Sequence, residues 1–576
     1  MVNVKNKKIT FLLFFVLQFS FLSAQIKNES LVQEQSIQKK LESYIKLKEN
    51  KDLKSSYKNF SKILSENRDI ETGRLLNFMI QKKLKPNSHF RNFFQSYLLF
   101  FSSASHDLDS WINVLQKVLQ ENTINKFNNF LIYSADLVQL NSIRKTKTLN
   151  WSYSDSKVFF DYVDQNPVVV FSDPTNLKCT TKGNSIKINL TRGKYYPFEN
   201  KWKGEEGVVD WSTHSISSDS IYVILDKYKI DTRSTKINCD SVSFYNKYLF
   251  DKPLTGKFQN RISIGKMSQT YPRFTSYSKK IFLKEIFNGI DYEGGYMLNG
   301  KKFIADGGKY ADAKIIFKKN GKKLLVAESD RFNLESKSLT SSSCALKIYF
   351  DNDSIFHSDL KLKYFDDERK LQLFNSINTS FRKPMINSYH KMSIYFEMME
   401  WLIDSSLIEF GSVPGASISN VEFESLDFFD EKKYDMLAGI DEIHPLILIS
   451  NYVRDKKENI FYVSDFAKYI GYPILQVKNY LINLSNYGFL FYDSGEERIY
   501  VQESVEKYIR AKSKLSDYDV ISFVSSLRNN SKNKIVNAAI NLENKDLMIA
   551  GVRDITLSKT QSVFLKPFKG RLIFKK

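Results

Sequence analysis

The spacing of apolar residues changes its period along this chain, and that change limits the folds open to it. From Trp151 to Lys370, apolar and polar residues alternate in short runs between Gly, Pro, Asn and Asp, as in β-strands and turns. Between Gly439 and Lys512 the period becomes about 3.6, which is typical of helices with one buried face. We therefore predict a small helical module inserted into a β-rich chain.

The chain before Trp151 is predicted to form helices. Apolar residues, many of them aromatic, recur at helical spacing from about Leu31 to Ser142. The stretch Pro86-Asn87-Ser88 separates two of these helices. Helices of this length suit a small antiparallel bundle or a short α-solenoid, and no repeat period in the sequence decides between the two.

The region from Trp151 to Lys370 is predicted to be all β. Strands are expected at 158–160, 168–171, 185–190, 221–225, 313–317, 323–327, 345–350 and 360–364, with turns at 173–174, 182–184, 192–193 and 203–204. Asp-Ser precedes an apolar alternation at Asp219, Asp240 and Asp353, as though one turn and strand unit were reused. This repetition favours a β-solenoid, and an irregular β-sandwich is the alternative.

Two further segments flank the module. Met385 to Glu409 is predicted to be a helix, because Met392, Phe396 and Met399 share one helical face. After the module, strands are expected at 535–542, 546–550, 555–557 and 562–565. The β pattern reaches Lys576 without a capping element, and an uncapped stack exposes an edge, so a natural and a truncated C-terminus both stay open.

The module has a readable order of elements. A helix is expected from Pro445, a strand at 461–463, a helix capped by Ser464, a helix from Pro473, a hairpin at 490–501 and a last helix from about Ser504. Residues 445–512 resemble a winged-helix domain in this order. The resemblance implies a three-helix core with a β wing, and such domains often read DNA with the third helix.

The charges of the module argue against DNA binding. Helix 474–487 carries only Lys478 as a cation, and Glu496 and Glu497 at the wing tip would repel phosphate. A structural role or a protein contact is therefore the expectation for the module.

The N-terminus predicts export. Lys5, Lys7 and Lys8 precede an apolar run at 9–22, and small residues follow at 23–24, as in a secretory signal. The run is shorter than the roughly 20 residues that span a bilayer. No Cys follows it directly, so lipid attachment is not indicated. We expect a protein of the periplasm or the cell surface.

The net charge selects the expected partners. The full chain has a net charge of +21, and removal of three lysines with the signal leaves +18. Because export separates the protein from the chromosome, acidic glycans or envelope proteins are the expected partners, with peripheral membrane contact as a further option. The alternative explanation of the positive charge is a lysine-rich coding bias. Cys179, Cys239 and Cys344 have no metal-ligand spacing, and at most one pair could form a disulfide.

Few residues in the sequence suggest chemistry. Asp291 and Glu293 lie two apart on a predicted strand, where paired carboxylates could bind a cation or act as acid and base. A solvated strand face is the more ordinary interpretation. The acidic stretches at 351–353 and 366–368 are expected to be turns, since neither has the spacing of a calcium loop. His390 and His444 are expected to be hydrogen-bonded structural residues. We assign no catalytic, cofactor-binding or metal-binding residue.

Several phrases are similar to a wider group of proteins. They are Tyr292-Glu293-Gly294-Gly295-Tyr296, Ile386-Asn387-Ser388-Tyr389-His390, Leu407-Ile408-Glu409-Phe410 and Gly439-Ile440-Asp441-Glu442-Ile443-His444-Pro445-Leu446. In these phrases the chain resembles the N-terminal part of long exported proteins of Bacteroidetes-type bacteria. The resemblance implies no activity and no site.

Together these observations predict an α+β multidomain protein. The expected parts are a signal peptide (1–24), a helical bundle or short α-solenoid (25–145), a β-rich solenoid-like region (146–432), a winged-helix-like module (433–514) and a β continuation (515–576). The expected function is a non-enzymatic scaffold or binding protein of the cell envelope. The alternatives are a β-solenoid carbohydrate-active enzyme and nucleic-acid binding through the module.

Overall fold

A computed structural model describes most of the chain in two compact units, Met1–Arg273 and Phe274–Lys576. The described residues are 39–45, 51–67, 70–154, 156–263, 269–308, 312–375, 383–426, 429, 431–438, 443–493, 496–513, 515, 521–528, 534–557, 563–564 and 572–574. The predicted signal peptide lies outside them. Each unit is described by itself below.

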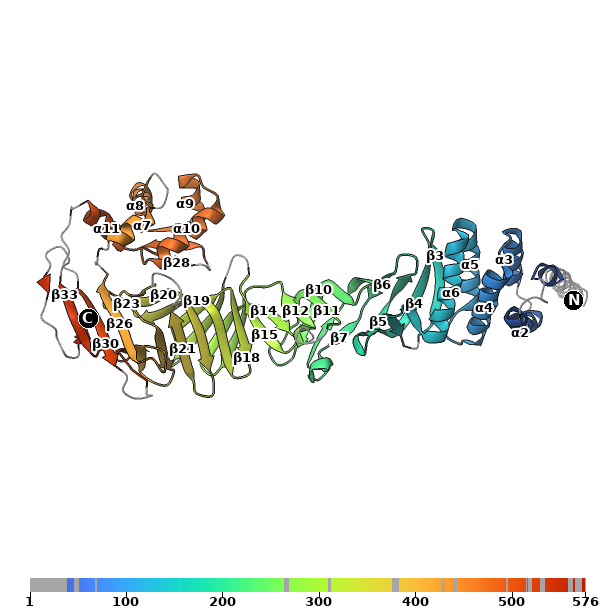
Figure 1. Cartoon of the computed structure of the whole chain (residues 1–576), viewed down its shortest axis with the longest axis horizontal. Helices are drawn as coiled ribbons and strands as arrows, with labels where there is room; N and C mark the ends of the chain where they lie inside the picture. Colours follow the sequence, from blue (N-terminus) through green and yellow to red (C-terminus); the bar gives the residue numbers. More distant parts are fainter. Residues whose placement is uncertain are drawn as a thin grey trace, which may run out of the picture. The chain divides into compact units, whose positions relative to one another are not determined.

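The first unit begins with the predicted helices (Figure 1). They are α2 (Lys51–Asn67), α3 (Ile70–Gln81), α4 (Arg91–Ser102), α5 (Leu108–Glu121) and α6 (Ile124–Leu140). The Asp107 carboxylate accepts a hydrogen bond from the Ser110 N–H at 3.0 Å, which caps α5. The predicted separator is a π-helical turn, Pro86–Phe90, that leads into α4. The aromatic stripe forms the core, where Trp111 stacks on Phe100 at 4.4 Å between ring centroids.

Antiparallel strands make up the rest of the first unit. They are β1 (Ser142–Lys145), β2 (Asn150–Tyr153), β3 (Val158–Val163), β4 (Asn166–Thr181), β5 (Asn184–Tyr196), β6 (Lys201–Glu205), β7 (Val208–Asp210), β8 (Ile221–Ile224), β9 (Lys227–Asp231), β10 (Lys236–Asn246) and β11 (Leu254–Arg261). β5 pairs with β4, β6 and β7, and β6 also pairs with β9. The predicted strands of this region are confirmed.

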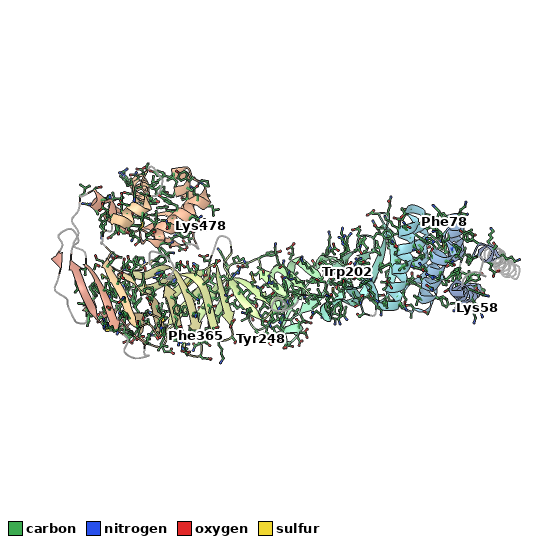
Figure 2. The ribbon with its side chains drawn as sticks, viewed as in Figure 1. Lys58, Phe78, Trp202, Tyr248, Phe365 and Lys478 are labelled. Atoms are coloured by element: carbon green, nitrogen blue, oxygen red, sulfur yellow. The ribbon has the colours of Figure 1, made fainter. Side chains whose placement is uncertain are left out.

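Three of the four predicted turns in this region are wrong. Only 182–184 is a turn, where Lys182 and Gly183 have φ of +42° and +85°. The Pro174 position lies inside β4 at a bulge, the place where a strand tolerates proline. Gly193 and Gly204 are opposite each other in β5 and β6, and a Cβ on Gly204 would lie 2.2 Å from the Tyr228 ring. These glycines make room for aromatic rings, including the ring of Trp202, which Figure 2 labels.

The second unit is a large antiparallel β region. Before the insert its strands are β12 (Arg273–Ser276), β13 (Ile281–Phe287), β14 (Ile290–Asn299), β15 (Lys302–Asp306), β16 (Ala313–Lys319), β17 (Lys322–Ser329), β18 (Arg331–Glu335), β19 (Ser338–Phe350), β20 (Asp353–Phe365), β21 (Lys370–Asn375), β22 (Met385–Asn387), β23 (Met392–Tyr395), β24 (Met398–Leu402), β25 (Leu407–Gly411) and β26 (Ile418–Ser425). After the insert come β30 (Ile521–Arg528), β31 (Ala538–Asn541), β32 (Leu547–Ile549), β33 (Val552–Leu557), β34 (Val563–Phe564) and β35 (Leu572–Phe574). The acidic turns at 351 and 366 are confirmed.

The helix predicted over 385–409 is wrong, because that segment forms β22 to β25. β23 buries Met392, Ser393 and Ile394 in succession, and β24 buries both Met398 and Met399, so these strands lack the strict alternation that marks a strand. Lys391, with φ of +55°, ends a reversal between β22 and β23 that no helix could contain. The reused Asp-Ser unit is also irregular, because Asp240-Ser241 lies at a bulge inside β10.

The module is an insert between two neighbouring strands, β26 and β30, which pair directly from Ile418↔Arg528 to Glu424↔Ser522. It contains α7 (Glu431–Leu437), α8 (Pro445–Lys456), β27 (Ile460–Tyr462), α9 (Val463–Ile470), α10 (Ile474–Asn486), β28 (Leu490–Asp493), β29 (Arg498–Val501) and α11 (Ser504–Lys512). The predicted order of elements is present. Ser464 lies within α9 and is not its cap, because the helix begins one residue earlier. The module has its own hydrophobic core and its own three-stranded sheet.

Among the described residues, no helix is long and apolar enough to cross a membrane. The three cysteines are buried and unbridged, and burial raises the pKa of the Cys179 and Cys239 thiols to about 12. They are therefore unreactive thiols of the core.

Candidate functional site

The paired carboxylates of the second unit have structural partners. Asp291 in β14 is 2 % exposed, forms an ion pair with Lys318 and accepts a hydrogen bond from the Glu285 N–H at 3.0 Å. Glu293 lies opposite Lys314 of β16, which forms an ion pair with Glu328 at 3.1 Å. The two carboxylates share a strand face as predicted, but Asp291 is already paired with Lys318, and Glu293 lies opposite a lysine that pairs with Glu328.

Both flagged histidines are hydrogen-bonded, as predicted. His390 Nε2 bonds to the Lys545 carbonyl at 2.8 Å, and His444 Nε2 bonds to the Tyr434 carbonyl at 2.9 Å. Burial lowers the pKa of each ring. No group of three or more His, Cys, Asp or Glu that could hold a metal ion occurs among the described residues.

The module contacts the β region through its hairpin (Figure 1). Phe491 of β28 packs edge-on against Phe356 of β20, with 4.9 Å between ring centroids, and the Lys347 ammonium lies 4.2 Å from the Phe491 centroid. A Cβ on Gly488 would lie 2.9 Å from the Ile386 side chain of β22, so the module's backbone approaches the β region closely at this glycine. Desolvation raises the pKa of Glu328 and lowers that of Lys347 beside this contact.

Helix α10 is a poor surface for a phosphate backbone. Lys478, its only cation, forms an ion pair with Glu497 of the hairpin at 3.3 Å. The exposed N-terminal turn of the helix carries Ile474 and Leu475, which are 53 % and 73 % exposed. The paired lysine and the exposed apolar residues are further reasons to predict that the module does not use this helix to bind DNA.

The first unit carries a different kind of surface, a row of like charges. Lys194 of β5, Lys203 of β6 and Lys229 of β9 lie directly opposite one another across the three strands. All three side chains are exposed. No ion pair joins any of them to a carboxylate of the described residues. We call these three residues the lysine row.

The rows on either side of the lysine row contain charges of both signs. Two residues toward one end, the same strands place Arg192, Glu205 and Lys227 opposite one another, so the signs alternate. Two residues toward the other end, Lys201 lies opposite Asp231. Opposite charges across strands stabilise a sheet and like charges destabilise it, each by roughly 0.2–1 kcal/mol. Of these three rows, only the middle one holds cations without a carboxylate, and its Lys203 ammonium lies 4.0 Å from the centroid of the Tyr196 ring.

Alternation along each strand directs the row outwards. The burial of β6 alternates strictly, with Trp202 and Gly204 inside and Lys203 outside. Inside, the Tyr228 hydroxyl bonds to Thr191 Oγ1 at 2.6 Å and accepts from Trp202 Nε1 at 3.3 Å. This packed inner face holds the register, and the register places the lysines in line.

A polar cleft of about 680 Å³ opens near the other end of β5. Lys178 of β4 and Lys187 of β5 line it and are again directly opposite each other, and Arg261 of β11 adds a third cation. The cleft is lined by Lys178, Asn184, Ser185, Ile186, Lys187, Asn189, Val209, Asp210, Ser212, Thr213, His214, Asn260, Arg261, Ile262, Ser263, Gln269, Tyr271 and Pro272.

Asp210, the one carboxylate among the described residues of the cleft, is already engaged. Asp210 Oδ1 accepts hydrogen bonds from the Ser212 N–H at 2.9 Å and from its hydroxyl at 2.5 Å. His214 Nε2 donates to the Tyr271 carbonyl at 2.5 Å. Asn189 Oδ1 and Ser263 Oγ are shielded from solvent and meet no hydrogen-bond partner within the described ranges. The cleft therefore combines excess positive charge with unused polar groups, which suits an anionic, hydroxyl-rich ligand.

Comparison with known proteins adds no family. A scan against protein-family models finds no match, and searches of curated proteins and of solved structures find no significant similarity.

Sequence reasoning missed both cationic features. Their residues are ordinary lysines in a chain with 85 Lys and Arg, so composition does not distinguish them. A signal existed in Lys194 and Lys203, which lie at equal distances from the turn at 197–200 and must face each other if it closes a hairpin. Placing that turn at 203–204 concealed the pairing.

Proposed function

We propose that this protein is an exported binding scaffold of the cell envelope whose first unit holds an acidic glycan. The lysine row carries the proposal, because three like charges aligned without a carboxylate weaken the isolated sheet and gain a partner when a polyanion lies across them. Lys178 and Lys187 repeat the same unfavourable pairing in the polar cleft.

An extended glycan polymer suits this surface better than a protruding protein surface does. The row is exposed on an open sheet face, and strands lie roughly 4.8 Å apart, so its ammonium groups can meet successive carboxylates of a flexible chain. Binding of this type is electrostatic and weakens as salt increases. The cleft offers amides and hydroxyls besides its cations, which suits the hydroxyl groups of sugars.

We infer that the module is a winged-helix-like brace, since it has a separate core and touches the sheet through Phe491. The β region is inferred to be a solenoid, because its strands pair with near neighbours in the chain, such as β20 with β22 and β21 with β24. Export rests on the N-terminal pattern, and recovery of the natural protein from cytosol would refute it.

The binding proposal is tested by calorimetric titration of the purified chain. The ligands are polygalacturonate, an uncharged glucan of similar length and duplex DNA, each at low and at moderate salt. Variant Lys194→Glu reverses one charge of the row. Lys252→Glu is the matched control, because Lys252 is an exposed residue of the same unit outside the row.

The proposal predicts that polygalacturonate binds the wild-type protein and the Lys252→Glu control, that Lys194→Glu binds it at least tenfold more weakly, and that the uncharged glucan does not bind. Equal binding by both variants would overturn the role of the row. Tighter binding of DNA than of polygalacturonate would favour nucleic-acid binding instead.

A further inference from the structure

A second cavity of the first unit lies between α6, β1 and the turn that follows β5, with a volume of about 390 Å³. This is at the small end of ligand pockets, which enclose roughly 300–1,000 Å³. From its walls and unused polar groups we propose that it binds a single sugar ring that carries a carboxylate.

Aromatic rings form the walls of this cavity. Tyr133 of α6 lies 5.9 Å from Phe130 and 5.9 Å from Tyr195 of β5, measured between ring centroids. Phe198 of the turn meets Phe130 edge-on at 6.2 Å. Such walls offer flat apolar faces, and the C–H faces of a pyranose ring can pack against them.

Two polar groups at the walls have unused hydrogen-bonding capacity. The Tyr133 hydroxyl and the Arg144 Nε are shielded from solvent and have no hydrogen-bond partner in the described part of the chain. Burial raises the pKa of Tyr133 well above its usual value, so its hydroxyl keeps its proton. A buried polar group without a hydrogen-bond partner destabilises the fold, and a ligand toward which these groups turn removes that cost.

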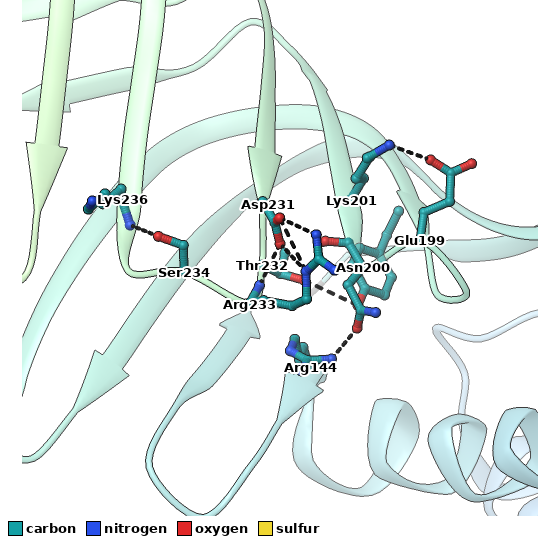
Figure 3. A network of polar contacts seen from close by, with 10 residues as sticks. Arg144, Glu199, Asn200, Lys201, Asp231, Thr232, Arg233, Ser234 and Lys236 are labelled. Atoms are coloured by element: carbon teal, nitrogen blue, oxygen red, sulfur yellow. Dashed lines mark hydrogen bonds and ion pairs between the residues drawn. The ribbon is translucent and has the colours of Figure 1, made fainter.

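Figure 3 shows that the Arg144 side chain is held in place. It donates to Asn200 Oδ1, and the Asn200 carbonyl accepts from the Thr232 N–H and hydroxyl, each at 2.9 Å. The nearby Asp231 carboxylate is bound by Arg233, whose hydrogen bonds lower the pKa of Asp231 to about 2. Asp231 is therefore occupied. The Arg144 guanidinium already meets Asn200 and the Tyr195 hydroxyl, and its Nε–H remains for an incoming carboxylate.

The rim supplies groups for sugar hydroxyls. Asn129 and Asp136 of α6 line the cavity, and neither has a hydrogen-bond or ion-pair partner among the described residues. An amide and a carboxylate accept from hydroxyl groups, while Arg144 pairs with an acid group. A uronate has a carboxylate for Arg144 and hydroxyl groups for Asn129 and Asp136, and its ring can pack against the aromatic walls. The inference takes its ligand class from the proposed function, but its site shares no residue with the lysine row or the cleft.

Monosaccharide titration followed by saturation-transfer NMR tests the inference on the full chain. The probes are glucuronate and glucose. Tyr133→Phe removes only an unpartnered oxygen, so it should preserve or raise the free energy of unfolding. Arg144→Gln removes the cation. Tyr248→Phe is the matched control, because Tyr248 is 71 % exposed in the same unit and its hydroxyl donates to Ser220 Oγ, outside the set of residues that line the cavity.

Glucuronate should bind the wild-type protein more tightly than glucose does. Tyr133→Phe should weaken glucuronate binding about fivefold, as expected for one hydrogen bond, and Arg144→Gln should abolish the preference over glucose. Tyr248→Phe should change neither. Absence of glucuronate binding, or unchanged binding by Tyr133→Phe, would overturn the inference. Lys194→Glu separates the two proposals, because it should lose polygalacturonate and retain glucuronate.

Discussion

Lys194 and Lys203 lie directly opposite each other on exposed positions of β5 and β6, and the described residues place no carboxylate in an ion pair with either. The next row on the same strands pairs Arg192 with Glu205. The same strands therefore have the geometry for charge compensation, and the row that holds Lys194 and Lys203 lacks it. We interpret the difference as a binding surface.

This interpretation predicts a gain in stability when the row is broken. Lys194→Glu converts a like-charge pair into an opposite pair and should raise the free energy of unfolding of the first unit by roughly 0.5–1 kcal/mol at low salt. Urea unfolding followed by the fluorescence of buried tryptophans measures it. A lower stability than wild type would show that Lys194 has a stabilising contact instead.

Acid should destabilise the second unit through His357. Both nitrogens of this buried ring are used, since Nε2 bonds to the Lys383 carbonyl at 3.1 Å and Nδ1 accepts from the Asp359 N–H at 3.0 Å. Desolvation lowers its pKa from 6.5 to about 4. Between these values the unfolded chain binds more protons, so stability falls as pH drops from about 6.5 to 4, by up to roughly 3 kcal/mol.

His357→Gln should remove most of this fall in the free energy of unfolding, while His390→Gln should retain most of the fall. Denaturant unfolding at pH 7, 6, 5 and 4 gives the comparison. An unchanged slope in His357→Gln would assign the acid sensitivity to other groups.

Asp291 should matter for stability and not for catalysis. Asp291→Asn leaves Lys318 without its buried partner, and should cost roughly 2–3 kcal/mol because the Lys318 side chain is only 27 % exposed. The double variant Asp291→Leu with Lys318→Met should recover most of that loss. Thermal unfolding of the three proteins measures it, and full stability of the single variant would contradict the structural role.

Loss of the Phe491 ring should detach the module from the sheet without unfolding the module. Phe491→Ala removes the ring that meets Phe356 and Lys347, while the core of the module does not include Phe491. Amide hydrogen exchange should become faster in β20 and β28 and stay unchanged in α8 and α9. Loss of protection throughout the module would show that it depends on the sheet to fold.

Sequence reasoning succeeds where one period dominates. The helices before Trp151, the strand and turn order of the module and most strands between them follow from local pattern. It fails at 385–409, because consecutive buried positions in β23 and β24 interrupt the alternation of a strand. Glycines at 193 and 204 indicate space for rings, which looks like a turn signal in the sequence. The candidate sites depend on register across strands, so residue types alone could not reveal them.

The most direct test of the central claim is the salt dependence of polygalacturonate binding. A plot of the logarithm of the dissociation constant against the logarithm of salt concentration should be linear for the wild-type protein, with a slope of several released ions. Lys194→Glu should reduce that slope by at least about one. An affinity that does not change with salt, or the same slope in both proteins, would contradict binding through the lysine row.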